Sequence, residues 1–252
     1  MVHLVTSPYR PGAGLIGRGP LATRIGRWVG FGLDILCPVR CPLCGVETGG
    51  AASCGPCRRL LDAEPARCLR CGATGGCRGC RRIADGVVVL GGYTDSLRSA
   101  VLRGKRPTGD ATVAGLGRLL VERHRATLDE WRIDAVVPVP MHWTRRCVRG
   151  TNAAVGLADA VAAALGVPRR SLLRRVRATP MQNRLPPENR AANVRGAVRC
   201  RRVAGERILL VDDVTTTGAT LVECRRMLAA AGAAAVYAAA VARADRGRDA
   251  DD

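Results

Sequence analysis

The sequence predicts an α/β protein in which a parallel sheet flanked by helices follows a small N-terminal cysteine-rich module. Apolar segments alternate with helical segments between residues 87 and 243, and eight cysteines form four C-x2-C pairs before residue 82. Continuous apolar strands between helices are typical of parallel sheets covered on both faces. We therefore expect a loose N-terminus at 1–24, a cysteine module at 25–82 and an α/β domain at 83–252.

The alternation assigns each element of the second domain in turn. The expected strands are residues 87–93, 134–140, 207–213 and 234–243, and the expected helices are residues 109–126, 152–166 and 218–232. A further short amphipathic helix is expected over residues 24–36, leading into the cysteine module. That module lacks an apolar core of its own, so its folding is expected to depend on metal.

The spacing of the cysteines in the sequence indicates metal binding. The four pairs are Cys41/Cys44, Cys54/Cys57, Cys68/Cys71 and Cys77/Cys80. Two intervening residues let both thiolates of a pair reach one tetrahedral ion, so four pairs predict two structural Zn²⁺ sites. A disulfide framework or a redox pair are the alternatives, and the absence of a secretory signal disfavours the first. Cys37 is a spare or alternative thiol, and Cys147, Cys200 and Cys224 are expected to be buried small residues.

The charge of the chain is unevenly distributed. The formal charge is +19, of which residues 1–82 carry +8, 83–134 carry +1, 135–202 carry +12 and 203–252 carry −2. Nearly all of the excess is arginine, which indicates either a GC-rich coding sequence or a surface for phosphates. The longest uncharged apolar run has 15 residues, fewer than the ~20 of a membrane span, and no signal peptide is evident. A cytoplasmic protein without a membrane span is expected.

The stretch VDDVTTTGAT carries the clearest functional signal. Asp212 and Asp213 end an apolar strand, and the residues from Thr215 to Thr220 offer hydroxyls, backbone N–H groups and a helix N-terminus. Such a loop can cradle a phosphate, while the carboxylates suit sugar hydroxyls or a metal-chelated diol. Helix capping by Thr217 alone is the alternative. Neither a P-loop nor a dinucleotide-binding fingerprint is present.

This stretch resembles the signature of type I phosphoribosyltransferases, which bind 5-phosphoribosyl 1-diphosphate (PRPP) with Mg²⁺. The resemblance implies that Asp212 and Asp213 hold the ribose hydroxyls and act in catalysis. The cysteine pairs, VVPVPMHWTRRCVRGTNAA, RVRATPMQNRLPPENRAANVRGA and the signature together resemble the ComF family over residues 33–243. The implied PRPP-binding residues are Asp212, Asp213, Val214, Thr215, Thr216, Thr217, Gly218, Ala219, Thr220, Lys105, Arg145, Arg149 and Asn152.

Two segments depart from the family pattern. The usual R-G-F-N-Q is here Arg149-Gly150-Thr151-Asn152-Ala153, which changes an aromatic and an amide position. The usual L-K-Y-x-G is here LRGKR, residues 102–106. Its Lys105, the only lysine, indicates a retained pyrophosphate contact, with a chance exposed lysine as the alternative. Most arginines are expected to be solvated surface residues, although Arg177, Gln182 and Arg184 could belong to a closing lid.

Three functions are compatible with the sequence. The leading hypothesis is transfer of a phosphoribosyl group to an unidentified acceptor. The second is a non-enzymatic sensor of PRPP. The third is an accessory protein of DNA uptake or processing, with a helicase or uptake proteins as partners and nucleic acid on its arginine-rich surface. Only 3% of residues are aromatic, which argues against autonomous binding of single strands by base stacking.

Overall fold

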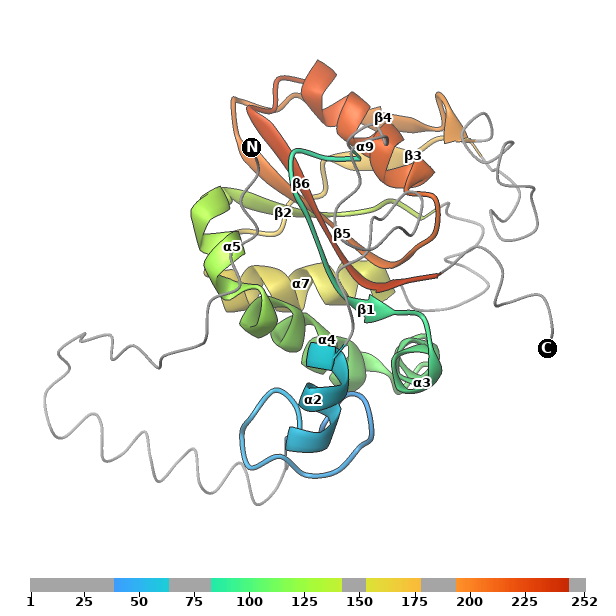
Figure 1. The fold of residues 1–252 in the computed structure, drawn as a ribbon. Coiled ribbons are helices and arrows are strands. Elements are labelled where there is room, and N and C mark those ends of the chain that lie inside the picture. Colours follow the sequence, from blue (N-terminus) through green and yellow to red (C-terminus); the bar gives the residue numbers. More distant parts are fainter. Residues whose placement is uncertain (1–38, 64–82, 142–152, 178–193, 245–252) are drawn as a thin grey trace, which may run out of the picture. The chain divides into compact units, whose positions relative to one another are not determined.

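Four parallel strands form the centre of the fold. The computed structural model describes residues 39–63, 83–141, 153–177 and 194–244, all within the unit Val39–Asp252. The strands lie in the order β1 (Val87–Gly92), β6 (Ala235–Arg243), β5 (Arg207–Thr215) and β2 (Ala135–Pro138) (Figure 1). Every neighbouring pair in this sheet is parallel. The predicted α/β class with a parallel sheet is confirmed.

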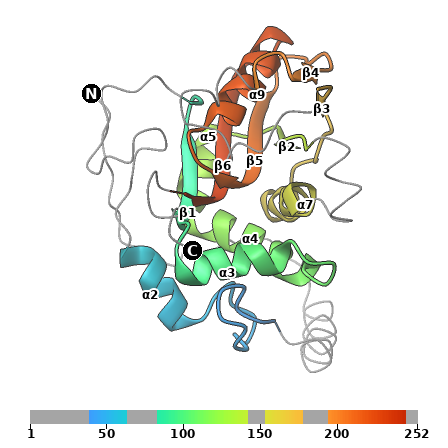
Figure 2. The same cartoon turned by 90° about the vertical axis from the view of Figure 1, so that its right-hand side faces the viewer.

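Helices cover both faces of this sheet. Strand residues alternate between two hydrophobic clusters: Leu209 and Val211 belong to one, and Ile208 and Leu210 to the other. Figure 2 shows α9 on one side of the sheet and α3, α4 and α7 on the other. The bounds of these helices are α3 (Asp95–Gly104), α4 (Asp110–Arg123), α7 (Ala153–Leu165) and α9 (Ala219–Ala230).

Several elements differ from the sequence-based prediction. The helix expected over 109–126 is divided at His124 into α4 and α5 (Arg125–Trp131), because the backbone of His124 leaves the helical conformation at φ −111° and ψ 19°. Its ring nitrogen Nε2 lies 3.0 Å from the carbonyl oxygen of Val89 on β1. Among the described residues, four elements were not predicted: α2 (Gly55–Ala63), α3, and the antiparallel strands β3 (Leu173–Arg175) and β4 (Val198–Cys200).

Strand β5 is longer than predicted. The sequence indicated that it ends at Asp213, but it continues to Thr215 because β6 stays paired with it. The register joins Asp212 to Ala240, Val214 to Ala242 and Thr215 to Arg243. The acidic pair therefore lies within the last residues of a paired strand, and its backbone is held on one side by β6.

The helices α4 and α7 approach each other closely at Gly117. A Cβ atom on Gly117 would lie 2.6 Å from the Cβ of Ala160, so glycine is required at this crossing. The contact fixes α7, whose first residue, Ala153, lies near the carboxyl end of the sheet. A second tight contact stacks Trp131 on Tyr237 of β6, with ring centroids 4.5 Å apart.

The described part of the cysteine module packs into the same core as the α/β domain. Residues 39–50 form a turn that leads to α2 (Gly55–Ala63), and Leu43 and Leu61 are 3% and 4% exposed. Both leucines belong to the hydrophobic cluster that contains Val101 of α3 and Leu116 of α4. None of the helices in the described residues is long and apolar enough to cross a membrane.

Candidate functional site

The two aspartates of β5 mark the site at the carboxyl end of the sheet. Successive residues of a strand face opposite sides, so Asp213 shares the face of Leu209 and Val211, and Asp212 faces α9. The Asp213 N–H donates to Asp212 Oδ1 at 2.9 Å, and the Val214 N–H donates to Asp213 Oδ1 at 2.8 Å. These bonds fix both carboxylates against their own backbone.

Lys105 contacts the acidic pair directly. It follows Gly104, the last residue of α3, and its Nζ lies 2.9 Å from Asp213 Oδ2. The two side chains are only 26% and 23% exposed, so the ion pair is partly shielded from water. The lysine that the sequence indicated as a pyrophosphate contact thus pairs with Asp213, the carboxyl group that the sequence predicted to hold the ribose.

The pKa of Asp212 is raised well above the usual carboxyl value. Burial is the main cause, and the negative charge of Asp213 adds to it, while the charge of Lys105 partly opposes both. Burial and the nearby Asp213 carboxyl thus favour the protonated form of Asp212, next to the Asp213 oxygen that contacts Lys105. A pair of this kind can both donate to and accept from hydroxyl groups.

The loop after β5 turns sharply into α9. Gly218 has φ +68°, a left-handed conformation that favours glycine, and a Cβ there would lie 2.5 Å from Ile83 Cδ1. The hydroxyl of Thr217 accepts a hydrogen bond from the Ala219 N–H at 3.4 Å, so it does contribute to capping. The first N–H groups of a helix lack intrahelical partners and bind anions well. Thr216 and Thr220 lie beside them, partly buried.

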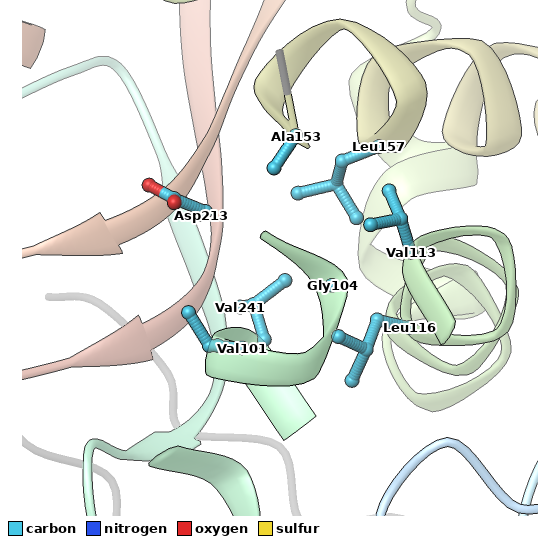
Figure 3. A pocket seen from close by; sticks show the side chains of 8 residues that line it. All are labelled: Val101, Gly104, Val113, Leu116, Ala153, Leu157, Asp213 and Val241. Atoms are coloured by element: carbon cyan, nitrogen blue, oxygen red, sulfur yellow. The ribbon is translucent and has the colours of Figure 1, made fainter. Parts of the chain in front are cut away.

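A small apolar cavity lies beneath Asp213 (Figure 3). Its volume is about 10 Å³, which is room for no more than one water molecule. The residues that line it are Val101, Gly104, Val113, Leu116, Ala153, Leu157, Asp213 and Val241. The cavity therefore belongs to the packing between α3, α4 and α7 and is too small to bind a sugar phosphate.

Several predicted site residues lie outside the described part of the chain. They are Arg145, Arg149 and Asn152 of the site, Cys68, Cys71, Cys77 and Cys80 of the second cysteine quartet, and Cys37 and Cys147. Sequence reasoning did not single out Arg243, which is 5% exposed and pairs in register with Thr215. The signal available in the sequence was its position, because Arg243 is a charged residue at the end of the apolar strand β6.

The first two cysteine pairs come together. One sulfur from each of Cys41, Cys44, Cys54 and Cys57 lies within 4.8 Å of the others, and the Cys44 and Cys54 sulfurs are 3.6 Å apart. Four thiolates around one Zn²⁺ at about 2.3 Å would be separated by about 3.8 Å, so the cluster matches a tetrahedral site. All six described cysteines are free thiols. Cys224 is fully buried as predicted, whereas Cys200, also predicted to be buried, is only partly buried on the short strand β4.

The four sulfurs are brought together by a tight turn at residues 41–45 and by the start of α2. Gly45, at φ +82°, closes a knuckle in which its N–H donates to the Cys41 carbonyl at 2.8 Å. Cys57 lies in the first turn of α2, which starts directly after Cys54. Burial opposes ionisation of Cys41, but backbone N–H groups of Cys54, Cys44 and Leu43 outweigh it and lower its pKa to about 7. Burial and the neighbouring thiols raise the pKa of Cys57, so binding of zinc to the four sulfurs would displace protons.

A parallel sheet flanked by helices, with an acidic pair at the end of β5 and a tight turn at Gly218 into α9, is the arrangement of the phosphoribosyltransferase class. The family model described as "Phosphoribosyl transferase domain" matches residues 109–252. The chain belongs to the ComF family of phosphoribosyltransferase-domain proteins, as its full-length relatives show.

The relatives align over most of their length. "Competence protein F" of Haemophilus influenzae is 29% identical over 207 residues, which cover 76% of this chain and 90% of the relative. "DNA utilization protein YhgH" of Salmonella typhi is 31% identical over 201 residues, covering 78% and 80%. The protein of the same name from Escherichia coli K12 is 30% identical over 214 residues, covering 79% and 94%. Among solved structures, Leishmania donovani UMP synthase matches with a TM-score of 0.29 and 21% identity over 52% of this chain and 22% of its own.

Replacing Asp212 with asparagine tests its raised pKa. Because the folded-state pKa exceeds that of the unfolded chain, wild-type stability falls by about 1.4 kcal/mol per pH unit above pH ~4, until the folded carboxyl ionises. Asparagine keeps the oxygen that accepts the Asp213 N–H but does not titrate. We expect Asp212→Asn to be more stable than wild type at pH 7 in urea unfolding, with the gap closing toward pH 4. A gap independent of pH would contradict the assignment, and the exposed Asp129→Asn serves as the control.

Metal analysis tests the cysteine cluster. The double variant Cys54→Ser with Cys57→Ser removes two of the four sulfurs that meet in the structure, so it should lose about one zinc ion per chain relative to wild type. Inductively coupled plasma mass spectrometry measures the content. The control is Cys200→Ser, at a half-buried thiol on β4 outside the cluster, which should leave the zinc content unchanged. Equal zinc in the double variant and wild type would refute the site.

Proposed function

We propose that the protein binds PRPP together with Mg²⁺ and transfers the phosphoribosyl group to an acceptor that is not identified. The observation that carries this proposal is the arrangement at the end of β5. A carboxyl pair, a lysine on that pair and a helix-capping loop at Gly218 meet at the carboxyl edge of a parallel sheet. In open α/β sheets this edge is where ligands bind.

Each element of the arrangement has a role toward the donor. Asp213 accepts a hydrogen bond from one ribose hydroxyl, and the carboxyl group of Asp212, whose pKa is raised by burial, forms a hydrogen bond with the other. The loop at 216–218 and the first turn of α9 bind the 5′-phosphate through N–H groups and hydroxyls. Lys105 then exchanges its contact with Asp213 for one with the diphosphate, which carries more negative charge.

Leaving-group charge governs the transfer step. The bond from C1′ to the diphosphate oxygen breaks, the electron pair leaves with the diphosphate, and the acceptor forms the new bond to C1′. Mg²⁺ would neutralise the charge of the diphosphate when bound, and the carboxylate of Asp213 is a ligand that suits it. Lys105 adds a second positive charge on the same side of the ribose, which stabilises the departing anion.

We also propose that this activity is linked to DNA uptake or DNA processing. The support comes from the relatives, whose names describe competence and DNA utilization. Two zinc ions, one in the described cluster and one at the second quartet, would stabilise the cysteine module, residues 25–82, next in sequence to the predicted domain 83–252. A helicase or another uptake protein is the partner proposed for that module.

A charged pair on the small antiparallel sheet favours nucleic acid as a second ligand. Arg174 of β3 and Arg199 of β4 lie directly opposite each other, and both are exposed. Like charges in opposed positions destabilise a sheet unless an anion lies between them. Arg201 and Arg202 continue the exposed positive surface, and no acidic side chain of the described residues forms a salt bridge with these four arginines. A phosphate backbone matches this pattern.

Calorimetry tests the donor site. We expect Mg²⁺-dependent binding of PRPP to the wild type and about 100-fold weaker binding to Asp212→Asn with Asp213→Asn, because the hydrogen bonds between the ribose hydroxyls and the two carboxyl groups are lost. The double variant Asp134→Asn with Asp159→Asn removes the same number of acidic groups away from the site and should bind like the wild type. Unchanged affinity in the first variant would refute the site.

Release of pyrophosphate separates an enzyme from a sensor. Zinc-loaded protein is incubated with PRPP, Mg²⁺ and a panel of nucleobases, nucleotides and amines, and pyrophosphate is measured by a coupled assay. We expect release with at least one acceptor class, abolished by the Asp212 and Asp213 variant. Tight binding of PRPP without release in any reaction would favour a sensor.

Salt dependence tests the nucleic-acid surface. The variant Arg174→Glu with Arg199→Glu should weaken binding of a labelled single-stranded oligonucleotide and lower the slope of log affinity against log salt by about 1.4, or ~0.7 for each lost phosphate contact. The control reverses Arg98 and Arg118, two exposed arginines on α3 and α4. An equal loss of slope in both variants would indicate a nonspecific effect of net charge and contradict the proposed surface.

A further inference from the structure

Arg103 joins the cysteine knuckle to the helix that carries the site lysine. It lies in the last turn of α3, and its Nη2 donates to the carbonyl oxygens of Pro42 and Leu43 at 2.8 and 2.7 Å. Pro42 and Leu43 are the two residues between Cys41 and Cys44, so a single guanidinium group binds the inner turn of the knuckle. Figure 2 shows the knuckle, in blue, lying against α3.

Arg103 is separated from Lys105, the residue that contacts the acidic pair, by Gly104 alone. Gly104 ends α3, and the N–H of Lys105 caps the helix by donating to the carbonyls of Arg103 and Leu102. Lys105 then reaches Asp213 Oδ2 at 2.9 Å. The position of the last turn of α3 therefore determines both what Arg103 binds on one side and where Lys105 lies on the other.

Close packing limits the freedom of this turn. A Cβ on Gly104 would lie 2.9 Å from Val113 Cγ2, and a Cβ on Gly109 would lie 2.5 Å from the carbonyl oxygen of Arg103. On the knuckle side, Gly115 of α4 leaves room for Pro42, whose Cβ would be 3.1 Å from an added Cβ. At these three contacts, little space is available to absorb a displacement of the knuckle.

We propose that Arg103 is a positioning residue that couples metal occupancy of the cysteine cluster to the affinity of the PRPP site. Metal holds the Cys41–Cys44 turn in one conformation, the two carbonyls hold Arg103, and the α3 end holds Lys105 at the acidic pair. By linkage, PRPP strengthens metal retention by the same factor. This coupling rests on the proposed donor site, and its chemistry requires no contact between Arg103 and the ligand.

Arg123 provides a matched comparison. It lies on α4, and it too ties residues 39–63 to the domain, by donating to the Leu61 carbonyl at 2.8 Å and pairing with Asp62. Its contacts are at the end of α2 and not at the knuckle. Loss of either arginine removes a hydrogen-bonded contact between residues 39–63 and the helices. Only Arg103 lies in the last turn of α3, two residues before Lys105.

Binding and metal release test the coupling on the full, zinc-loaded chain. We expect Arg103→Met to weaken Mg²⁺-dependent PRPP binding about 5- to 20-fold in calorimetry, within the range usual for coupled sites, and Arg123→Met to change it less than about twofold. Saturating PRPP should slow zinc release to a colorimetric chelator in the wild type and in Arg123→Met but not in Arg103→Met. Equal effects of the two variants on affinity, or zinc release in the wild type that ignores PRPP, would overturn the proposal.

Hydrogen exchange tests, without PRPP, whether zinc at the cysteine cluster stabilises the end of α3. Removal of zinc from the wild type should increase amide exchange in peptides covering residues 99–110, and Arg103→Met should show that increase with zinc bound. Exchange in this segment that does not respond to zinc would refute the coupling even if PRPP binds. Conversely, a wild type that binds no PRPP but shows the exchange response would refute the donor site alone. Arg103→Lys, which keeps the charge, supplies an intermediate response if the methionine variant is poorly folded.

Discussion

The pairing of β5 with β6 over the whole of both strands is the constraint on which the site depends. Apolar residues of β5 are buried on both faces, and the ladder continues past them through Asp212 to Thr215. Without that continuation the acidic pair would lie in a loop, free to turn its carboxylates to water. Because the backbone is held, burial can raise the pKa of Asp212, and Lys105 finds Asp213 at a fixed place.

The sequence was most informative where the local pattern and the tertiary structure have the same cause. Apolar runs such as ILLV are buried on both faces, and therefore the parallel strands could be predicted, as could the meeting of the first two cysteine pairs. The three-residue strands β3 and β4 could not, since LRR and VRC have no apolar periodicity and are defined by their mutual pairing. The extension of β5 was equally hidden, because its cause is pairing with β6, whose partner residues lie 28 positions later in the chain.

Charge is organised differently on the two sides of the fold. At the carboxyl edge, one lysine faces two carboxyl groups, so positive and negative groups compensate each other until a ligand with its own charge competes for them. On the antiparallel sheet, the exposed side chains of Arg174 and Arg199 lie opposite each other, so charges of the same sign meet there. The sequence predicted Lys105 near the diphosphate from family resemblance, but only the fold could show that it rests on Asp213.

The shared core of the knuckle and the helices also bears on how such a protein can evolve. Cys41 and Leu43 are buried against α3 and α4, and Pro42 occupies the space that Gly115 leaves open. The two parts are therefore not interchangeable modules, because each carries half of a fitted surface. Recombination between distant relatives at the end of the cysteine region would join mismatched halves, and inheritance as a single piece is the route that preserves both.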